Sequence, residues 1–159
     1  MRRILILVSL LFSVVSYGQL PNDFRVLYFA DVDTSVLILS KMVKQQKNPP
    51  ISVEVNNESI TQNRTKATVA ISLSVIIPDN LSHYTSQTSI FYENITSVEV
   101  EERANWRISY KSKVTKQSDV IVLNDKEMAE KAYAALLCLI RHSGSKYYDE
   151  ILKTQIKEY

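Results

Sequence analysis

Glycine and cysteine are both scarce in this chain. Only two glycines, Gly18 and Gly144, occur in 159 residues. A loop that cradles phosphate needs several glycines close together, so the sequence excludes a P-loop and a dinucleotide-binding fingerprint. The single cysteine, Cys138, has no partner for a disulfide within the chain. We therefore expect burial and hydrogen bonding to supply the stability.

An excess of charge is lacking as well. The chain has 19 Lys and Arg residues against 17 Asp and Glu, a formal net charge of +2. Arg2 and Arg3 belong to a segment that we expect to be removed, which leaves 17 residues of each sign. Proteins that bind nucleic acids need clustered Lys and Arg to displace counterions, so we predict no nucleic-acid partner.

Residues 1–18 have the pattern of a secretory signal peptide. Arg2 and Arg3 precede the apolar run "ILILVSLLFSVV", and Ser16 and Gly18 supply the small residues that signal peptidase requires. The ending "YGQ" resembles signal peptides of the Bacteroidetes type, with cleavage before Gln19 and no cysteine there to carry a lipid. We predict export to the periplasm or the extracellular space, with no membrane span after cleavage. The alternative is an uncleaved anchor helix, which the shortness of the run disfavours.

One break divides the rest of the chain. Pro49 and Pro50 in "KQQKNPP" cannot continue a helix. We therefore expect an N-terminal segment at 19–48, a main domain at 49–144 and a C-terminal segment at 145–159.

The N-terminal segment contains the ambiguous stretch "DTSVLILSKMVKQQK". The prediction is a helix over 34–46 that is capped by Asp33 and places Val36, Leu39 and Val43 on one face. A short strand through Val36 to Leu39 is the alternative, because the apolar run fits both periods. The preceding "FRVLYFA" fits either a strand or a helical turn.

After the break the apolar period changes to two, which is typical of strands. "ISVEV" places Ile51, Val53 and Val55 on one face, and "ATVAISLSVII" predicts a long strand over 67–77 that ends in a turn at 78–80. The stretches "TSIFYE", "ITSVEVEE", "WRISYKS" and "DVIVL" extend the pattern.

One hairpin is specified in register by its alternation. A three-residue loop at 103–105 predicts three cross-strand pairs: Val98 with Tyr110, Val100 with Ile108 and Glu101 with Arg107. Asn105 is expected to take the left-handed conformation that closes such a loop. The charged pair is expected to be solvated on the outer face, not to form a site.

The stretch "SDVIVLNDKEMAEKAYAALLCLIRHSG" predicts a strand followed by an amphipathic helix. Asn124 is the expected N-cap, Glu127 completes a variant of the capping box, and Gly144 ends the helix. The expected apolar stripe contains Met128, Ala129, Ala132, Tyr133, Leu136, Leu139 and Ile140. The residues expected to face away from it are Lys126, Glu130, Lys131 and Arg141.

A narrow patch interrupts the charged side of this helix. It consists of Ala134, Leu137 and Cys138, and we expect either the chain's own ends or a partner to pack there. After the helix, "KYYDEILKTQIKEY" predicts a second short helix. Its apolar face is expected to contain Tyr148, Ile151 or Leu152, and Ile156.

The pattern "FYENITSVEVEERANWRISYK" followed by "SDVIVLNDKEMAEKAYAALLCLI" resembles pleckstrin-homology-like (PH-like) domains over residues 51–142. The resemblance implies an α+β, mostly β fold, in which a C-terminal helix closes a curved antiparallel sheet or open barrel. The family's phosphoinositide site does not carry over, because Arg64 and Lys66 are the only basic residues near the relevant loop. A lipocalin-like barrel and other α+β folds stay open as alternatives.

Few residues suggest chemistry. His83 and His142 have no ligand-spaced partners, and no histidine and aspartate pattern accompanies Cys138. Glu99, Glu101 and Glu102 fall mainly on an outer sheet face, where a shifted pKa is not expected. We therefore predict no enzymatic activity, with no catalytic, cofactor-binding or metal residues.

The function expected from these observations is a non-enzymatic binding or protein-interaction module, with an exposed sheet edge or the segment after Gly144 as the place for an unidentified protein partner. The alternative is a lipocalin-like carrier for an apolar ligand. Its cavity would be lined by Phe91, Tyr92, Trp106 and Tyr110, which we expect instead to fill the core.

Overall fold

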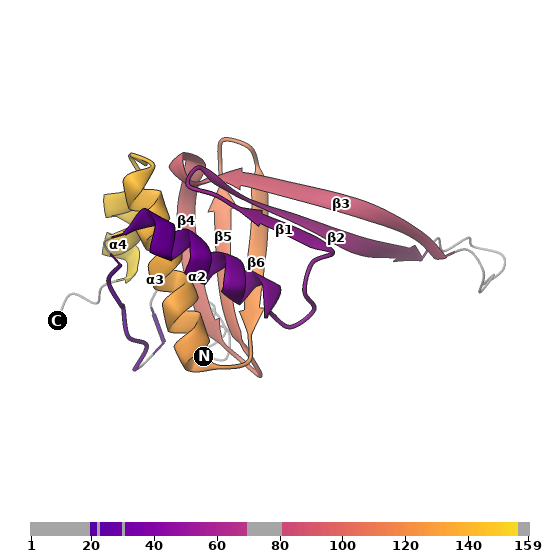
Figure 1. Ribbon diagram of the computed structural model, residues 1–159, viewed down its shortest axis with the longest axis horizontal. Coiled ribbons are helices and arrows are strands. Elements are labelled where there is room, and N and C mark those ends of the chain that lie inside the picture. Colours follow the sequence, from indigo (N-terminus) through magenta and orange to yellow (C-terminus); the bar gives the residue numbers. More distant parts are fainter. Residues whose placement is uncertain (1–19, 22, 30, 70–80, 156–159) are drawn as a thin grey trace, which may run out of the picture.

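The computed structural model describes residues 20–155 except 22, 30 and 70–80, and it shows an α+β protein with two antiparallel sheets (Figure 1). The helices are α2 (Val32–Lys44), α3 (Lys126–His142) and α4 (Tyr148–Gln155), with a short 3-10 helix η1 (Tyr92–Asn94). One sheet contains β1 (Ser52–Val55), β2 (Ser59–Val69) and β3 (Leu81–Phe91) in that order. The other contains β4 (Ile95–Glu102), β5 (Trp106–Ser112) and β6 (Gln117–Leu123) in that order.

The predicted N-terminal helix is confirmed, but its cap is not Asp33. Asp31 has an extended backbone, and its carboxylate accepts the Thr34 backbone N–H at 2.7 Å, so the helix begins two residues earlier than expected. Leu39 and Val43 are fully buried where α2 packs on α3. The stretch before the helix forms neither a strand nor a helix in its described residues.

The first sheet differs from the expected strand boundaries. β2 begins at Ser59 instead of residue 67, and it pairs with β3 from Ser59 opposite Phe91 to Val69 opposite Leu81. Residues 70–77 of the predicted long strand, and the predicted turn at 78–80, lie outside the described residues. Ile51 was expected to share one face with Val53 and Val55, but it precedes β1 and its side chain is 64% exposed.

The register of the β4–β5 hairpin is confirmed. Val98 lies opposite Tyr110, Val100 opposite Ile108, and Glu101 opposite Arg107. Asn105 does not take the expected left-handed conformation, so that prediction was wrong. The loop is closed instead by a hydrogen bond from the Arg103 backbone N–H to the Asn105 carbonyl at 3.1 Å. The carboxylate of Glu101 forms an ion pair with Arg103 at 3.1 Å, on the exposed side of the loop.

Helix α3 begins one residue later than expected. Asp125, not Asn124, is the N-cap, and its carboxylate accepts the Met128 backbone N–H at 3.0 Å. Glu127 therefore cannot complete a capping box, and it pairs with Lys131 instead. Gly144 ends the helix with a φ of 73°, as predicted. The expected apolar stripe is buried, with Met128 partly buried at its margin.

Among the described residues, one hydrophobic core joins the three helices to both sheets. Helix α3 packs on β5 and β6, and α4 contacts β4, so these two helices cover one side of the second sheet, while α2 packs on α3 and β1 (Figure 1). In the described part of the chain the two sheets stay separate and do not close into a barrel. The α+β class, the antiparallel sheets and the C-terminal helix are confirmed. The β2–β3 ribbon runs past β1 and away from the helices (Figure 1).

Candidate functional site

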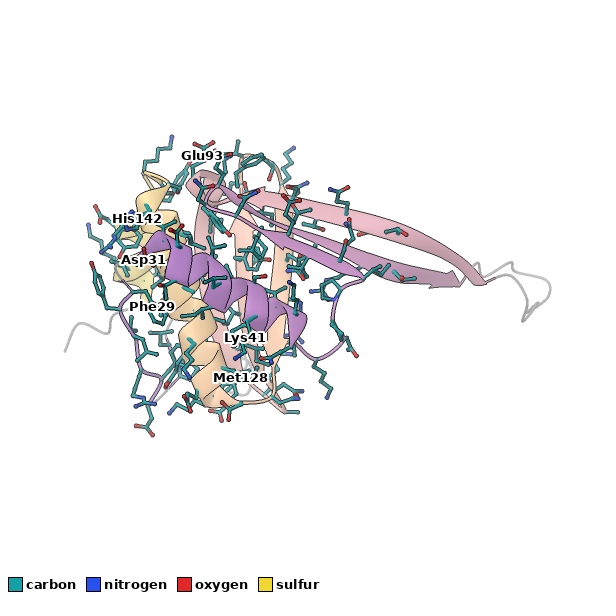
Figure 2. All side chains as sticks on the ribbon, viewed as in Figure 1. Phe29, Asp31, Lys41, Glu93, Met128 and His142 are labelled. Carbon is teal, nitrogen blue, oxygen red and sulfur yellow. The ribbon has the colours of Figure 1, made fainter. Side chains whose placement is uncertain are left out.

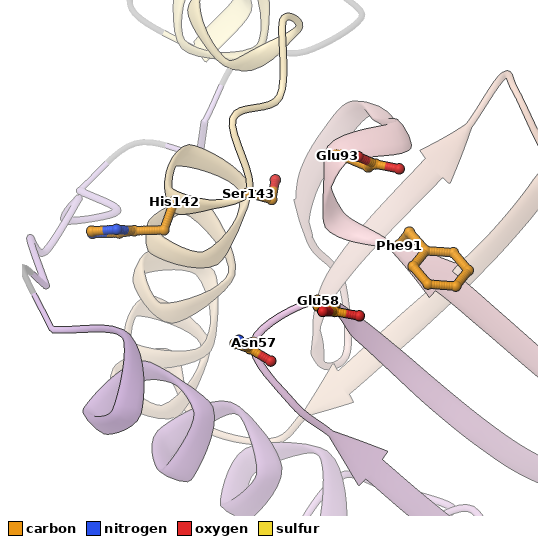
Figure 3. Close-up of a pocket in the computed structure, with 6 residues that line it drawn as sticks. All are labelled: Asn57, Glu58, Phe91, Glu93, His142 and Ser143. Atoms are coloured by element: carbon orange, nitrogen blue, oxygen red, sulfur yellow. The ribbon is translucent and has the colours of Figure 1, made fainter.

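A groove of about 380 Å³ lies where the base of the β2–β3 ribbon meets the end of α3 (Figure 3). Its lining consists of Asn57, Glu58, Phe91, Glu93, His142 and Ser143. The turn between β1 and β2 is held by the side-chain oxygen of Asn56, which accepts the backbone N–H groups of Glu58 at 2.9 Å and Ser59 at 2.8 Å. The Glu58 carbonyl then accepts the Tyr92 N–H at 2.9 Å, which fixes the end of β3 beside the groove.

The groove does not assemble groups for acid–base catalysis. His142 points away from Glu93 and Phe91, and these two point to the opposite side (Figure 3). The hydroxyl of Ser143 donates to the Ile140 carbonyl at 2.8 Å and is thus held by its own helix. Within the described residues no group of three or more His, Cys, Asp or Glu side chains could hold a metal ion.

The strand beside this groove has an open edge. Among the described strands β3 has β2 as its one neighbour in the sheet, so half of its backbone groups point away from the ladder. The bond from Tyr92 to Glu58 shows that the even-numbered residues of β3 bond to β2. The backbone groups of Thr85, Gln87, Ser89 and Phe91 therefore point outward. The Phe91 carbonyl belongs to the first turn of η1, whose N-cap is Phe91. None of the other outward groups has a hydrogen-bond partner within the described residues.

The outer edge of β6 shows how this protein covers another strand edge. The Val122 carbonyl accepts the Lys47 backbone N–H at 2.7 Å. The Val120 carbonyl accepts a guanidinium N–H of Arg64 at 3.1 Å, and the Val122 N–H lies 3.4 Å from the side-chain oxygen of Gln46. Because no comparable set of bonds protects β3 within the described chain, its edge is open to another strand.

A buried polar cluster joins the two sheets behind this ribbon, and sequence reasoning missed it. The amide of Gln62 donates to the Tyr110 hydroxyl at 2.8 Å, and its oxygen accepts from Arg64 at 2.6 Å and from Gln46 at 3.0 Å. Arg64 also pairs with Asp119 at 3.7 Å. Burial, and then the nearby Asp119 carboxylate, raise the pKa of Tyr110 well above its ordinary value. These bonds link the two sheets and stabilise their junction, although the buried Nε of Arg64 has no hydrogen-bond partner among the described residues.

Arg64, which was considered above for a phosphoinositide site, belongs to this cluster. The side chain of Lys66, considered with it, is not among the described side chains. The one sequence signal for the cluster was Gln62, a polar residue at a core-facing position of a strand.

The patch of Ala134, Leu137 and Cys138 is covered by the chain itself. Their exposed fractions are 2%, 6% and 4%. A cavity of about 50 Å³ remains between them, the N-terminal residues 26–29 and α4. The Cys138 thiol lies 3.9 Å from the Asp31 carbonyl, and Phe29 and Asp31 lie beside the end of α3 that carries His142 (Figure 2). Of the two alternatives left open by the sequence, the chain's own segments occupy this position.

Glu130 was expected to face solvent and is instead fully buried. Its carboxylate accepts the Arg25 backbone N–H at 2.8 Å and the Arg25 Nε–H at 3.1 Å, and Lys126 lies 3.9 Å away. Burial by itself raises the pKa of Glu130, but the hydrogen bonds and charge of Arg25 outweigh it and lower that pKa. The hydrogen bonds between Arg25 and Glu130 therefore hold the N-terminal segment against α3.

The four aromatic residues considered for a carrier do not line one cavity. Tyr92 and Tyr110 are fully buried, and Trp106 packs against Phe24 with ring centroids 5.5 Å apart. Phe91 is 43% exposed on the ribbon. Three of the four therefore fill the core, and the fourth lies beside the open edge.

Comparisons with known proteins add no relative: no family model, no curated protein and no solved structure matches this chain. The resemblance to PH-like domains therefore stays a prediction. Among the described residues, no helix is both long and apolar enough to cross a bilayer.

Proposed function

We propose that this protein is an exported, non-enzymatic interaction module that takes up an extended polypeptide strand along the outer edge of β3. The observation that carries the proposal is the row of outward-pointing backbone groups at Thr85, Gln87, Ser89 and Phe91. Such a row is the template that β-strand addition requires, in which main-chain hydrogen bonds supply affinity. Each bond contributes about 0.5–1.5 kcal/mol, so several in register are needed for stable binding.

The surroundings of the edge support a role in recognition. Phe91 is 43% exposed at the base of the ribbon, directly beside the groove with Glu58 and Glu93. An apolar side chain of the added strand can pack on Phe91, while its neighbours reach the groove. Backbone pairing then supplies affinity, and the groove supplies selectivity.

Export and a PH-like architecture belong to the same proposal. The signal-peptide pattern of residues 1–18 supports export, although these residues lie outside the described part of the chain. Consecutive antiparallel strands followed by a helix that packs on β5 and β6 support the PH-like architecture. The finer statement, a barrel plugged by α3, would require pairing between the two sheets that the described residues do not make.

The test compares two substitutions at one position. Gln87→Pro removes an N–H that points outward while it leaves the ladder to β2 intact, because proline is tolerated where the N–H of an edge strand faces solvent. Gln87→Ala removes the side chain and keeps that N–H. We expect the wild type and Gln87→Ala to bind the same partner from the envelope fraction, and Gln87→Pro to lose it with an unchanged circular dichroism spectrum.

Hydrogen exchange then locates the contact. Binding should slow exchange at the outward-pointing amides of Thr85, Gln87, Ser89 and Phe91. Equal binding by Gln87→Pro, or unchanged exchange at these four amides in the complex, would overturn the proposed edge.

A further inference from the structure

We infer that the strand added to β3 is β3 of a second copy of this chain, paired antiparallel across a twofold axis near Gln87. This inference rests on the proposed function, because it uses the same edge. The product is a continuous sheet in the order β1-β2-β3-β3-β2-β1, with the helical parts of the two copies at opposite ends of the joined ribbons. Such an interface is isologous, so each contact occurs twice.

The backbone pattern permits this self-pairing. The outward groups belong to the odd-numbered residues of β3, and in an antiparallel pair of identical strands odd positions can face odd positions. An axis at Gln87 places Gln87 opposite its own copy and Thr85 opposite Ser89. Each of these residue pairs can exchange two N–H to C=O bonds, so the free donors and acceptors at the centre of the edge satisfy one another.

The side chains favour a second copy over a charged partner. No Lys, Arg, Asp, Glu or Pro occurs between Leu81 and Phe91. Natural proteins place such residues on exposed strand edges to prevent association, and here they are absent from the whole strand. The other sheet does carry them: β4 contains Glu99, Glu101 and Glu102, and β6 contains Asp119. A charge near a twofold axis would face its own copy, so an uncharged strand suits self-pairing in particular.

The long-range charge and the shape also agree with self-association. The formal net charge of the chain is +2, and it is zero after loss of Arg2 and Arg3, so two copies repel weakly. The ribbon extends beyond β1 and away from the helices (Figure 1). A second ribbon can therefore approach the β3 edge without first displacing a helix.

The experiment measures the molar mass of the chain as purified after export, by analytical ultracentrifugation over a range of concentrations. We expect the wild type to be a dimer. Gln87→Lys and Gln87→Glu, each alone, place like charges across the axis and should weaken association roughly 100-fold. An equal mixture of the two variants should restore a dimer, because opposite charges then face each other.

Glu54→Gln is the matched control. It changes the net charge by the same single unit as Gln87→Lys, but it lies on β1 at the opposite edge of the sheet. This variant should dimerise like the wild type. A restored Lys–Glu heterodimer together with a dimeric control supports the inference, since misfolding of the variants cannot produce it.

Two results would overturn the inference. One is a monomeric wild type at about 100 µM, far above the dissociation constant of a stable complex. The other is a Gln87→Lys variant that associates as the wild type does. If the wild type is monomeric and Gln87→Pro still abolishes capture of a different protein, self-pairing is refuted while the proposed function stands. If Gln87→Pro also leaves that capture unchanged, both fail.

Discussion

Removing the side chain of Arg25 should destabilise the protein although that side chain is mostly exposed. Its Nε–H donates to the buried Glu130 carboxylate at 3.1 Å, and its Nη2 lies 3.1 Å from the same oxygen. Hydrogen bonds to charged groups contribute about 1.5–3 kcal/mol. The Arg25 side chain is 71% exposed, so solvent screens its charge. The hydrogen bond from the Arg25 backbone N–H to the Glu130 carboxylate, at 2.8 Å, is kept in Arg25→Ala. We therefore expect a loss of about 1–2 kcal/mol in the free energy of unfolding.

The matched control is Lys126→Ala. The Lys126 ammonium lies 3.9 Å from the other carboxylate oxygen and forms an i, i+4 pair with Glu130. A partly exposed pair of this kind contributes about 0.5 kcal/mol or less. Glu130→Ala should cost more than Arg25→Ala, about 2–3 kcal/mol, because it leaves the Arg25 N–H without its acceptor and opens space in the core.

Urea unfolding followed by circular dichroism measures all three variants, and pH tests the mechanism. The folded-state pKa of Glu130 is lowered, so its contribution is present above the unfolded value of 4.5 and is lost as the pH falls through the folded value. The difference between the wild type and Arg25→Ala should therefore shrink from pH 7 to about pH 3.5. The reasoning would be refuted by an equal effect of Lys126→Ala, or by a cost of Arg25→Ala that does not change with pH.

Two further predictions concern the cap of α3 and the buried tyrosines. Asp125→Ala should lower the free energy of unfolding by about 1 kcal/mol and Asn124→Ala by less than about 0.3 kcal/mol, because the Asp125 carboxylate accepts the Met128 backbone N–H. Urea unfolding of both variants measures the two losses. Equal losses would contradict the assignment of Asp125 as the N-cap. Burial raises the pKa of Tyr92, Tyr110 and Tyr133 above the ordinary value of 10, so their contribution to stability is complete below pH 10 and falls as the unfolded phenols ionise above it. An ultraviolet titration should show these three ionising only as the protein unfolds, and their ionisation in a protein with a native circular dichroism spectrum would contradict the prediction.

The β4–β5 hairpin and the C-terminal helix were predictable because their signals are local. Alternating apolar and charged residues permit one register, since a slip by one residue buries Glu101 and Arg107. The errors lie at element ends. Asn124 and Asp125 are both good caps, and the direction in which the chain leaves β6 decides between two neighbouring residues of equal propensity.

The open edge of β3 was predictable only in general terms. The sequence indicated that some sheet edge would be exposed, but strand order is a property of the whole chain. The outer edge of β6 is covered by residues 46–47 and by Arg64. The sequence of β6 itself contains no signal that its edge would be covered. The same limit applies to Gln62, because two of its hydrogen-bond partners are distant in the chain: Gln46, just after α2, and Tyr110 on β5.

By itself, the sequence determined the β4–β5 hairpin, the apolar stripe of α3 and the absence of glycine-rich sites, because these depend on residues close together in the chain. Tertiary structure alone decided that Glu130 is buried, that the N-terminal segment covers Cys138, and that β3 lies at an edge. A charge enters the core only if a distant group compensates it, and for Glu130 that group is Arg25, 105 residues away. No local pattern contains such a partner.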